Sequence, residues 1–373
     1  MLKSNSVRKS IAIFLFCCLS TMLYSQTQHL LVGTYTNSGK SEGIYTFEFD
    51  GQKGTATLSQ ATHSPNPSYL TISPNQQFAY AVNESGDKST VSAFRYEAKT
   101  GALEFLNQVD SEGNDPCFLI ADQHHVLVAN YSGGTLAVFK ILEDGSLDSA
   151  SQVIKHTGKS IDPNGRQESA HVHQVKFTPD GKYVIATDLG EDKVYTYSYH
   201  PKSKDSILRW KSVYTTQAGS GPRHFAFSPN GKFVYLVHEF TGKIQTLSYK
   251  KGKLTFVEEI NTVAPDFKGK VDAADIHISA DGKFLYETNR GDANTISVFA
   301  IAANGSLQAV ETVSTLGKGP RNFTIDPSGK FLLVANQSSD SIVIFNRDAL
   351  TGKLTDSRNR IDCAVPVCLV FQN

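Results

Sequence analysis

Two histidines, one glutamate and two arginines of the sequence are residue types that can transfer protons and hold anions. They are His171 and His173, Glu239, and Arg223 with Arg290. A histidine or a glutamate can take a proton from water and return one to a leaving group, and an arginine can hold an oxyanion or a charged substrate group. These residues lie far apart in the sequence, so this chemistry depends on a fold that brings them together.

Further polar residues stand at positions that match those of the first group when similar segments of the sequence are aligned with one another. Arg321 follows Pro320 as Arg223 follows Pro222, and His173 falls in the same slot of its own segment. We expect seven residues to contact a substrate: His171, His224, Glu84, Asn130, Asp188, Arg321 and Gln337. Two alternatives to substrate binding stay open. The charged side chains at such positions can be paired with one another or solvated. Asn130 and Asp188 occupy a position where small polar residues cap turns.

Several other kinds of chemistry have no support in the sequence. It contains no Gly-rich phosphate loop before a helix, and it has no His/Cys spacing typical of a metal site. We therefore expect no metal and no cofactor, with a two-histidine metal site at Glu239 as the alternative. Since Lys+Arg 36 equals Asp+Glu 36, the composition also argues against nucleic acid and anionic membranes as partners.

A repeated turn phrase shows which elements must position these residues. It recurs as Ser73-Pro74-Asn75, Thr178-Pro179-Asp180-Gly181, Ser228-Pro229-Asn230-Gly231, Ser279-Ala280-Asp281-Gly282 and Asp326-Pro327-Ser328-Gly329. Pro followed by Asn/Asp-Gly is typical of tight turns, and apolar strands flank each one, so each predicts a hairpin. Strands of this kind are expected at 30–35, 78–84, 125–131, 183–189, 233–239, 284–290 and 331–337.

The spacing of these strands predicts an all-β, seven-bladed β-propeller. The steps between corresponding residues are 49, 47, 58, 50, 51 and 47, and a period of about 50 with several strands per unit is typical of propeller blades. Residues 366–371 resemble the inner strands 67–72 and 320–325, so we expect the C-terminal strand to complete the first blade and close the ring. One propeller domain would then cover residues 26–373, and we expect a monomer.

The propeller topology predicts where the polar residues meet. In each blade the inner strand leads into the turn and the second strand returns, so the repeated turns mark one face of the ring. The starts of inner strands and the ends of second strands meet on the other face, at the mouth of the central channel. Arg223 and Glu239 belong to one blade, His173 to the blade before and Arg290 to the blade after, so these four residues should line one arc of the mouth.

The N-terminus predicts export. Lys3, Arg8 and Lys9 precede the apolar run 11–23, which is short for a bilayer span and suits a secretory signal. We expect residues 1–25 to be removed after Ser25, leaving a periplasmic or secreted protein without a membrane span. Cys363 and Cys368 then form either a disulfide or two buried thiols.

Several segments in order resemble those of the seven-bladed β-propeller lactonases. They are Arg166-Gln167-Glu168, His171-Val172-His173, Asp188-Leu189-Gly190, Gly221-Pro222-Arg223-His224, Asn289-Arg290-Gly291 and Ala335-Asn336-Gln337. That family includes bacterial 6-phosphogluconolactonases and is similar to fungal carboxy-muconate lactonising enzymes. The resemblance covers essentially the whole mature chain. It implies a polar cleft at the channel mouth formed by His173 or His171 with Glu239, Arg223 and Arg290.

These observations together lead to one expected function and two alternatives. We expect hydrolysis of a sugar-acid lactone, with Glu239 or His173 as the base, the other as the acid, and Arg223 and Arg290 holding the oxyanion and charged substrate groups. A propeller that binds a ligand or a protein without catalysis is the first alternative, and a lactonising isomerase is the second. Because phosphogluconolactonases act in the cytoplasm, the export signal favours a different sugar lactone as substrate.

Overall fold

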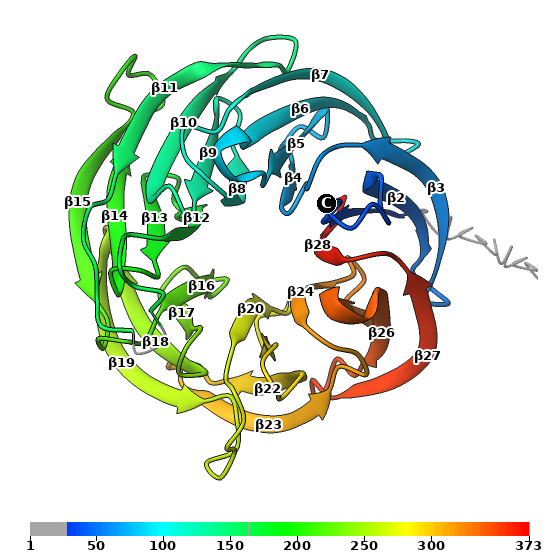
Figure 1. Cartoon of the computed structure of the whole chain (residues 1–373). Coiled ribbons are helices and arrows are strands. Elements are labelled where there is room, and N and C mark those ends of the chain that lie inside the picture. The colour runs from blue at the N-terminus through cyan, green and yellow to red at the C-terminus, as the bar shows by residue number, and fades with distance from the viewer. Residues whose placement is uncertain (1–27, 163–164, 373) are drawn as a thin grey trace, which may run out of the picture.

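Seven four-stranded antiparallel sheets surround a central axis in the computed structural model, which describes residues 28–162 and 165–372 (Figure 1). The innermost strands are β28 (Pro366–Phe371), β4 (Leu70–Ile72), β8 (Pro116–Ala121), β12 (Val172–Phe177), β16 (Pro222–Phe227), β20 (Ala273–Ile278) and β24 (Pro320–Ile325). The second strands are β1 (Gln28–Thr34), β5 (Phe78–Asn83), β9 (His125–Asn130), β13 (Tyr183–Asp188), β17 (Phe233–His238), β21 (Phe284–Asn289) and β25 (Phe331–Asn336).

The outer half of each blade consists of two further strands. The third strands are β2 (Gly43–Asp50), β6 (Thr90–Glu97), β10 (Thr135–Ile141), β14 (Lys193–Tyr199), β18 (Lys243–Lys250), β22 (Thr295–Ile301) and β26 (Ser341–Arg347). The outermost strands are β3 (Thr55–His63), β7 (Ala102–Asp110), β11 (Leu147–Lys155), β15 (Leu208–Thr215), β19 (Lys253–Asn261), β23 (Leu307–Ser314) and β27 (Leu354–Asp362). Two short 3-10 helices, η1 (Gly86–Lys88) and η2 (Gln337–Ser339), follow second strands at the rim.

Burial decreases from the second strand of a blade to its outermost strand. Every residue of β5 is buried, whereas β3 has no buried residue and alternates between exposed and half-buried positions. This gradient follows from the packing of sheets face to face, which covers both faces of the central strands and leaves the rim wet. The predicted seven second strands and the seven-bladed propeller are confirmed.

The repeated turn phrase is held by its own side chains. At one turn Ser228 Oγ donates to Asn230 Oδ1 at 2.8 Å and accepts from the backbone N–H of Phe233 at 2.9 Å. Gly231 has φ +66°, a left-handed conformation in which a Cβ would be strained. Because the same pattern recurs between other inner and second strands, these hairpins return the chain to the opposite face in the same way each time.

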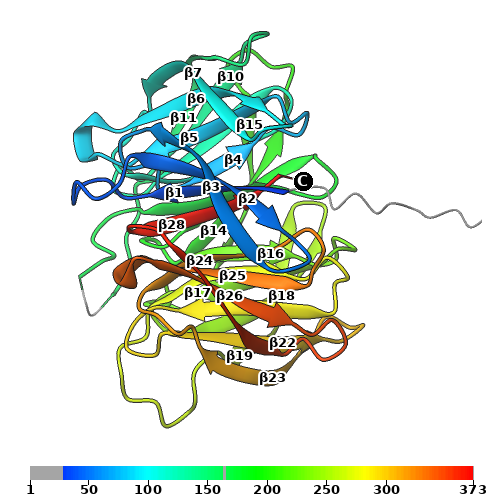
Figure 2. The same cartoon turned by 90° about the vertical axis from the view of Figure 1, so that its right-hand side faces the viewer.

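The C-terminal strand closes the ring, as predicted. The first blade has the strand order β28-β1-β2-β3, and β28 pairs antiparallel with β1 through Leu30 with Phe371 and Val32 with Leu369. Figures 1 and 2 show β28 in red beside the blue strands of this blade. The closure pairs residues from both ends of the described chain and removes an open sheet edge.

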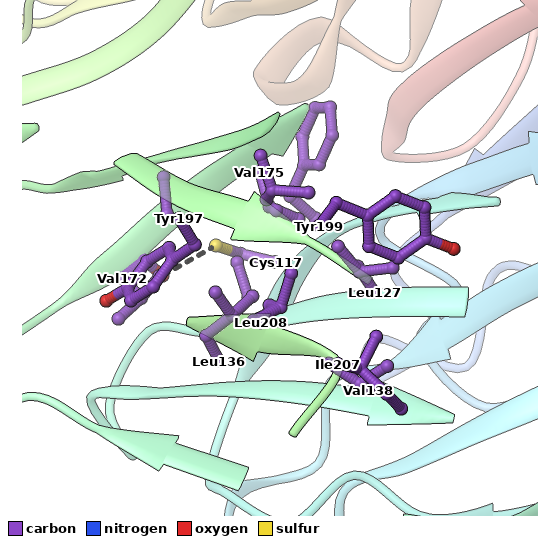
Figure 3. Packing of buried hydrophobic residues seen from close by; sticks show 14 residues of the cluster. Cys117, Leu127, Leu136, Val138, Val172, Val175, Tyr197, Tyr199, Ile207 and Leu208 are labelled. Carbon is purple, nitrogen blue, oxygen red and sulfur yellow. Dashed lines mark hydrogen bonds between the residues drawn. The ribbon is translucent and has the colours of Figure 1, made fainter. Parts of the chain in front are cut away.

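Apolar clusters fill the spaces between neighbouring blades. Figure 3 shows one of them, in which Cys117 of β8 packs among residues of β12, β13 and β14, with Val172 and Tyr197 close by. The Cys117 thiol lies 3.2 Å from the carbonyl oxygen of His173, so the side chain of β8 contacts the backbone at the start of β12. Cys117, Cys363 and Cys368 are all free and buried, so the disulfide alternative for the last two is wrong.

The predicted signal segment 1–25 lies outside the described residues. Within residues 28–162 and 165–372, no helix has the length and the apolar character that crossing a membrane requires.

Candidate active site

Glu239 lies at the centre of three arginines at one end of the propeller. It follows β17 directly and is 1% exposed. Arg166 Nη1 donates to its Oε1 at 2.6 Å, while Arg223 Nε and Arg290 Nη2 lie 2.8 Å and 3.2 Å from its Oε2. Arg223 starts the inner strand of the same blade, and Arg290 follows the second strand of the next blade. The expected arc of Arg223, Glu239 and Arg290 is therefore present in the structure.

The three arginines keep Glu239 ionised. Burial alone would raise the pKa of Glu239, but the positive charges of Arg290, Arg223 and Arg166 outweigh this effect and hold the pKa well below its usual range. A carboxylate in this state accepts protons poorly and has no proton to donate near neutral pH. The geometry thus favours a role for Glu239 in positioning the arginines over the proton-transfer role expected from the sequence.

The arginines differ in how far they reach toward solvent. The Arg223 side chain is 2% exposed, and its Nη1 donates to the carbonyl of Ala274 at 2.6 Å. Its Nε is close to Glu239 yet lacks a hydrogen bond, because the N–H is not aimed at the carboxylate. Arg290 is 14% exposed and also binds Asp272 Oδ1 at 2.9 Å, and Arg166 is 40% exposed. A ligand at the rim would therefore meet Arg166 and Arg290 before Arg223.

Tyr131 connects the arginines to the two histidines. It follows β9, and its hydroxyl accepts a hydrogen bond from Arg166 Nη2 at 2.9 Å. Its ring stacks on His171 with centroids 4.4 Å apart, and the His173 ring meets its edge at 5.6 Å. The structure thus brings His171, His173 and the arginines together around one aromatic side chain.

The hydrogen bonds of the two histidines differ. His171 Nδ1 lies 2.9 Å from the carbonyl oxygen of Tyr131, and since a carbonyl only accepts, Nδ1 is the donor of this bond and Nε2 is the ring nitrogen left for another partner. His173 is 4% exposed, and its Nδ1 has no partner among the described residues. Burial, followed by the charges of Arg223 and the neighbouring His224, lowers the pKa of His173 well below the ordinary value. His171 therefore has the better arrangement for a base.

Below the rim, a buried carboxylate organises the central channel. Asp275 of β20 accepts from His224 Nδ1 at 2.8 Å and His277 Nε2 at 2.9 Å, and Asn322 Nδ2 donates to it at 2.5 Å. Burial would raise the pKa of Asp275, but His277 and His224 hold it well below its usual range. His224 itself has its pKa lowered to about 3, first by burial and then by Arg223. His224 is thus a neutral, internally bonded residue of the channel wall.

Two of the residues expected to contact a substrate are hydrogen-bonded within the fold. Asn130 is fully buried, and its Nδ2 donates to Ser111 O at 2.8 Å and Thr135 Oγ1 at 2.9 Å. Asp188 is also fully buried and accepts from the backbone N–H of His171 at 2.8 Å. These internal hydrogen bonds favour the capping alternative over a substrate contact for both residues. Asp188 nevertheless fixes the backbone of His171.

The remaining expected contacts lie on another side of the mouth. The Tyr35 hydroxyl donates to Glu84 Oε2 at 2.7 Å, and the Tyr35 ring lies 5.7 Å from the guanidinium of Arg321. Arg321 forms no hydrogen bond or ion pair with any described residue. A cavity of ≈ 640 Å³ opens beside this group, and its walls include Tyr35, Glu84 and Gln337. The expected residues therefore divide into a cationic half around Glu239 and a second half around Glu84.

Comparison with known proteins gives the family. Residues 29–371 match the family model described as lactonase, seven-bladed β-propeller. The chain belongs to this lactonase family. It is 38% identical to a 6-phosphogluconolactonase of Bacillus subtilis over 91% of this chain and 97% of that protein, and 36% identical to a 6-phosphogluconolactonase of Formosa agariphila over 87% and 94%.

Solved structures agree with this membership. A putative 6-phosphogluconolactonase from Bacteroides fragilis superposes with a TM-score of 0.89 at 40% identity, covering 93% of this chain and 98% of that one. A periplasmic gluconolactonase from Pseudomonas aeruginosa gives a TM-score of 0.89 at 37% identity, with 93% and 99% covered. The names of these relatives favour a hydrolase over a non-catalytic binding propeller or a lactonising isomerase.

One group of possible metal ligands exists in the described part of this lactonase-family chain, and hydrogen bonds explain it. His156, Asp188 and Glu191 are buried together. His156 Nδ1 lies 2.6 Å from Asp188 Oδ2, and its Nε2 lies 2.7 Å from the Tyr197 hydroxyl. Glu191 Oε2 accepts from Lys193 Nζ at 2.8 Å. Because protein groups already hold both nitrogens of this histidine, the group fits a structural network better than a metal site.

Some important residues escaped the sequence analysis. The segment Arg166-Gln167-Glu168 was recognised as part of the family resemblance, but nothing in it pointed to an ion pair of Arg166 with Glu239, which is 73 positions away. Tyr131 occupies the same slot as Glu239 and Arg290, the slot whose residue type varies between blades. That variation marks Tyr131 as a candidate site residue, although it carries no charge.

Proposed function

We propose that this chain hydrolyses a sugar-acid lactone to the open-chain acid. The observation that carries the proposal is the match of residues 29–371 to the lactonase family, in a fold that places Glu239, three arginines and a histidine at one mouth. The relatives named above are lactonases by name, which supports the same class of reaction here.

His171 is the proposed base. Its Nδ1 proton is bound by the Tyr131 carbonyl, so its Nε2 lone pair is available to take a proton from water. Asp188 holds its backbone N–H at 2.8 Å, and the Tyr131 ring stacks against the imidazole, so two contacts fix its orientation. This assignment replaces His173, which lies deeper and whose pKa is lowered by burial and by neighbouring positive charge.

The arginines are proposed to stabilise the charge that develops on the lactone carbonyl oxygen. Arg166 has an exposed side chain and Arg290 a partly exposed one, and Arg321 is a cation without an ion pair in the described chain. Positively charged donors fixed in advance stabilise an oxyanion without reorganising during the reaction. Glu239 would hold two of them in place, as a positioning residue.

The reaction is balanced with these groups alone. His171 Nε2 removes a proton from water as the water oxygen bonds to the carbonyl carbon, giving a tetrahedral oxyanion. The bond from that carbon to the ring oxygen then breaks, and the imidazolium returns its proton to the departing alkoxide. The product is a hydroxy acid, which ionises and releases one proton to solvent.

Steady-state kinetics on a panel of sugar lactones tests this proposal. His171→Asn should lower kcat by roughly a hundredfold or more, the usual contribution of a general base. His173→Asn should have a smaller effect, and the exposed His124→Asn is the control. A folded His171→Asn variant with near-native kcat would remove His171 from the mechanism, and a wild-type protein without activity on any lactone would overturn the function.

Export is proposed from the charged and apolar N-terminal segment. A similar solved structure is named a periplasmic gluconolactonase, which supports a location outside the cytoplasm. An exported enzyme would act on lactones outside the cytoplasm, where unphosphorylated sugars are the accessible substrates.

A further inference from the structure

The cavity in the second half of the mouth has an unusual set of walls. It lies between the blades that contain β1, β5 and β25 and has a volume of ≈ 640 Å³. Glu84 and Asp115 contribute carboxylates, and Asn37, Asn66 and Gln337 contribute amides. The residues that line it include no lysine or arginine among those the structure describes. The cavity is therefore polar and acidic, in contrast to the arginines around Glu239.

Internal hydrogen bonds hold the two carboxylates while leaving each with an oxygen for a ligand. Glu84 Oε2 accepts from the Tyr35 hydroxyl at 2.7 Å, and Asp115 Oδ1 accepts from the backbone N–H of Gly86 at 2.9 Å. The second oxygen of each carboxylate makes no hydrogen bond within residues 28–162 and 165–372. The side-chain amide of Gln337 likewise has no partner in that part of the chain. The cavity thus presents fixed acceptors and an amide.

Arg321 links this cavity to the proposed reaction centre. Burial acts to lower the pKa of Arg321. The nearby Tyr35, Glu84 and Glu239 help to outweigh burial, so that the pKa of Arg321 is raised. Arg321 therefore lies within electrostatic reach of both Glu84 and Glu239. A lactone whose carbonyl faces the arginines can extend its other end past Tyr35 toward Glu84.

We propose that this cavity is a subsite for the hydroxyl groups of an unphosphorylated sugar lactone, and that Glu84 and Asp115 select against a phosphorylated one. The proposal rests on the lactone hydrolysis proposed above. Sugar hydroxyls donate hydrogen bonds to carboxylates, and such charge-assisted bonds are stronger than neutral ones. A phosphate dianion would instead meet two like charges without a cation in the cavity wall, a mismatch that opposes binding.

The arginines do not remove this selection. Arg166, Arg223 and Arg290 each pair with Glu239, and Arg290 pairs with Asp272 as well. Three arginines against the two carboxylates of Glu239 and Asp272 leave about one positive charge, which lies at the Glu239 group and outside the residues that line the cavity. Arg321 has no ion pair with a described residue, and its guanidinium lies 5.7 Å from the Tyr35 ring, while Arg321 itself is not among the residues that line the cavity. We infer that it attracts the lactone carbonyl oxygen between the two halves of the mouth.

The test compares glucono-1,5-lactone with its 6-phosphate, each corrected for spontaneous hydrolysis. Wild-type kcat/KM should be higher for the unphosphorylated lactone. Glu84→Gln and Asp115→Asn keep the oxygens that accept from Tyr35 and Gly86, so both variants should fold. Each should lower the ratio of unphosphorylated to phosphorylated kcat/KM roughly tenfold, as expected for the loss of one hydrogen bond to a charged group. Asp87→Asn, an exposed acid of η1 outside the cavity, should leave the ratio unchanged.

The outcomes separate this subsite from the lactonase function. A wild-type preference for the 6-phosphate, or an unchanged ratio in both cavity variants, would overturn the subsite while the lactonase function stands. Calorimetric titration with gluconate and 6-phosphogluconate tests binding without turnover. Tighter binding of gluconate, weakened by Glu84→Gln, would support the subsite even in a protein that hydrolyses neither lactone, and equal binding of both acids would overturn it.

Discussion

Glu287 is a buried carboxyl group that the proposed mechanism does not use. It lies in β21, opposite Ser297 of β22, and both of its oxygens lack a hydrogen-bond partner among the described residues. Burial raises the pKa of Glu287 to about 8. Thr262 acts in the opposite direction, but its hydroxyl donates to the carbonyl of Gly242 at 2.9 Å. The carboxyl group is therefore expected to stay protonated in the folded state at neutral pH.

This pKa makes the free energy of unfolding depend on pH. The ordinary pKa is 4.5, against about 8 in the fold. Because the folded pKa is raised, the contribution of protonated Glu287 to the unfolding free energy is complete below pH 4.5. This contribution is lost progressively as the pH rises toward 8. Above pH 8, ionisation of Glu287 no longer changes the unfolding free energy. One pKa unit corresponds to about 1.4 kcal/mol, so ionisation of the unfolded state alone costs the wild type about 3 kcal/mol at pH 7. Glu287→Gln is neutral at every pH and avoids this cost.

Denaturant unfolding of wild type and Glu287→Gln at several values between pH 5 and pH 8.5 measures the effect. Relative to wild type, the variant should gain about 4 kcal/mol in unfolding free energy between pH 5 and pH 8.5. Glu48→Gln, an exposed change on β2, is the matched control and should show no such trend. A Glu287→Gln difference that is the same at every pH would refute the reasoning, because Glu287 would then have to ionise alike in both states.

Two further predictions concern acid stability and processing. Asp275 has its pKa held well below 3.8 in the fold by His277 and His224 against the effect of burial, so its contribution is present above pH 3.8 and is lost as pH falls below it. Asp275→Asn should cost about 2–3 kcal/mol at pH 7 in denaturant unfolding, and this cost should shrink on the acid side of 3.8; a cost independent of pH would contradict this. Exported protein should begin at Gln26, and an intact mass that still includes residues 1–25 would disprove the cleavage.

The propeller was predictable because its signals are local and repeated. Each turn phrase combines a residue with fixed φ and a residue that accepts positive φ, and Gly231 and Gly282 do have φ of +66° and +70°. Repetition then gave the blade number and the ends of the second strands. The closing strand β28 was also predictable, since residues 366–371 have the pattern of an inner strand.

The site was predictable in position but not in its contacts. Topology placed Arg223, Glu239 and Arg290 on one arc because strand ends converge there, and no side-chain information was needed. Which groups pair is decided by side-chain reach across blades, and this explains why the ion pair of Arg166 with Glu239 was missed. The same limit explains the choice of His173 over His171, since only the Tyr131 carbonyl distinguishes their tautomers.

A propeller repeats one backbone position seven times around its mouth, so the residues that follow the second strands place five kinds of side chain in similar surroundings. Glu239 and Arg290 occupy that position in the cationic half, and Tyr35, Glu84 and Gln337 occupy it in the acidic half. A round mouth alone would accept a ligand in any orientation. This division gives it a direction, because an ester that develops negative charge is attracted to the arginines and a neutral polyol is accepted beside Glu84. The two proposals thus describe opposite ends of one bound substrate.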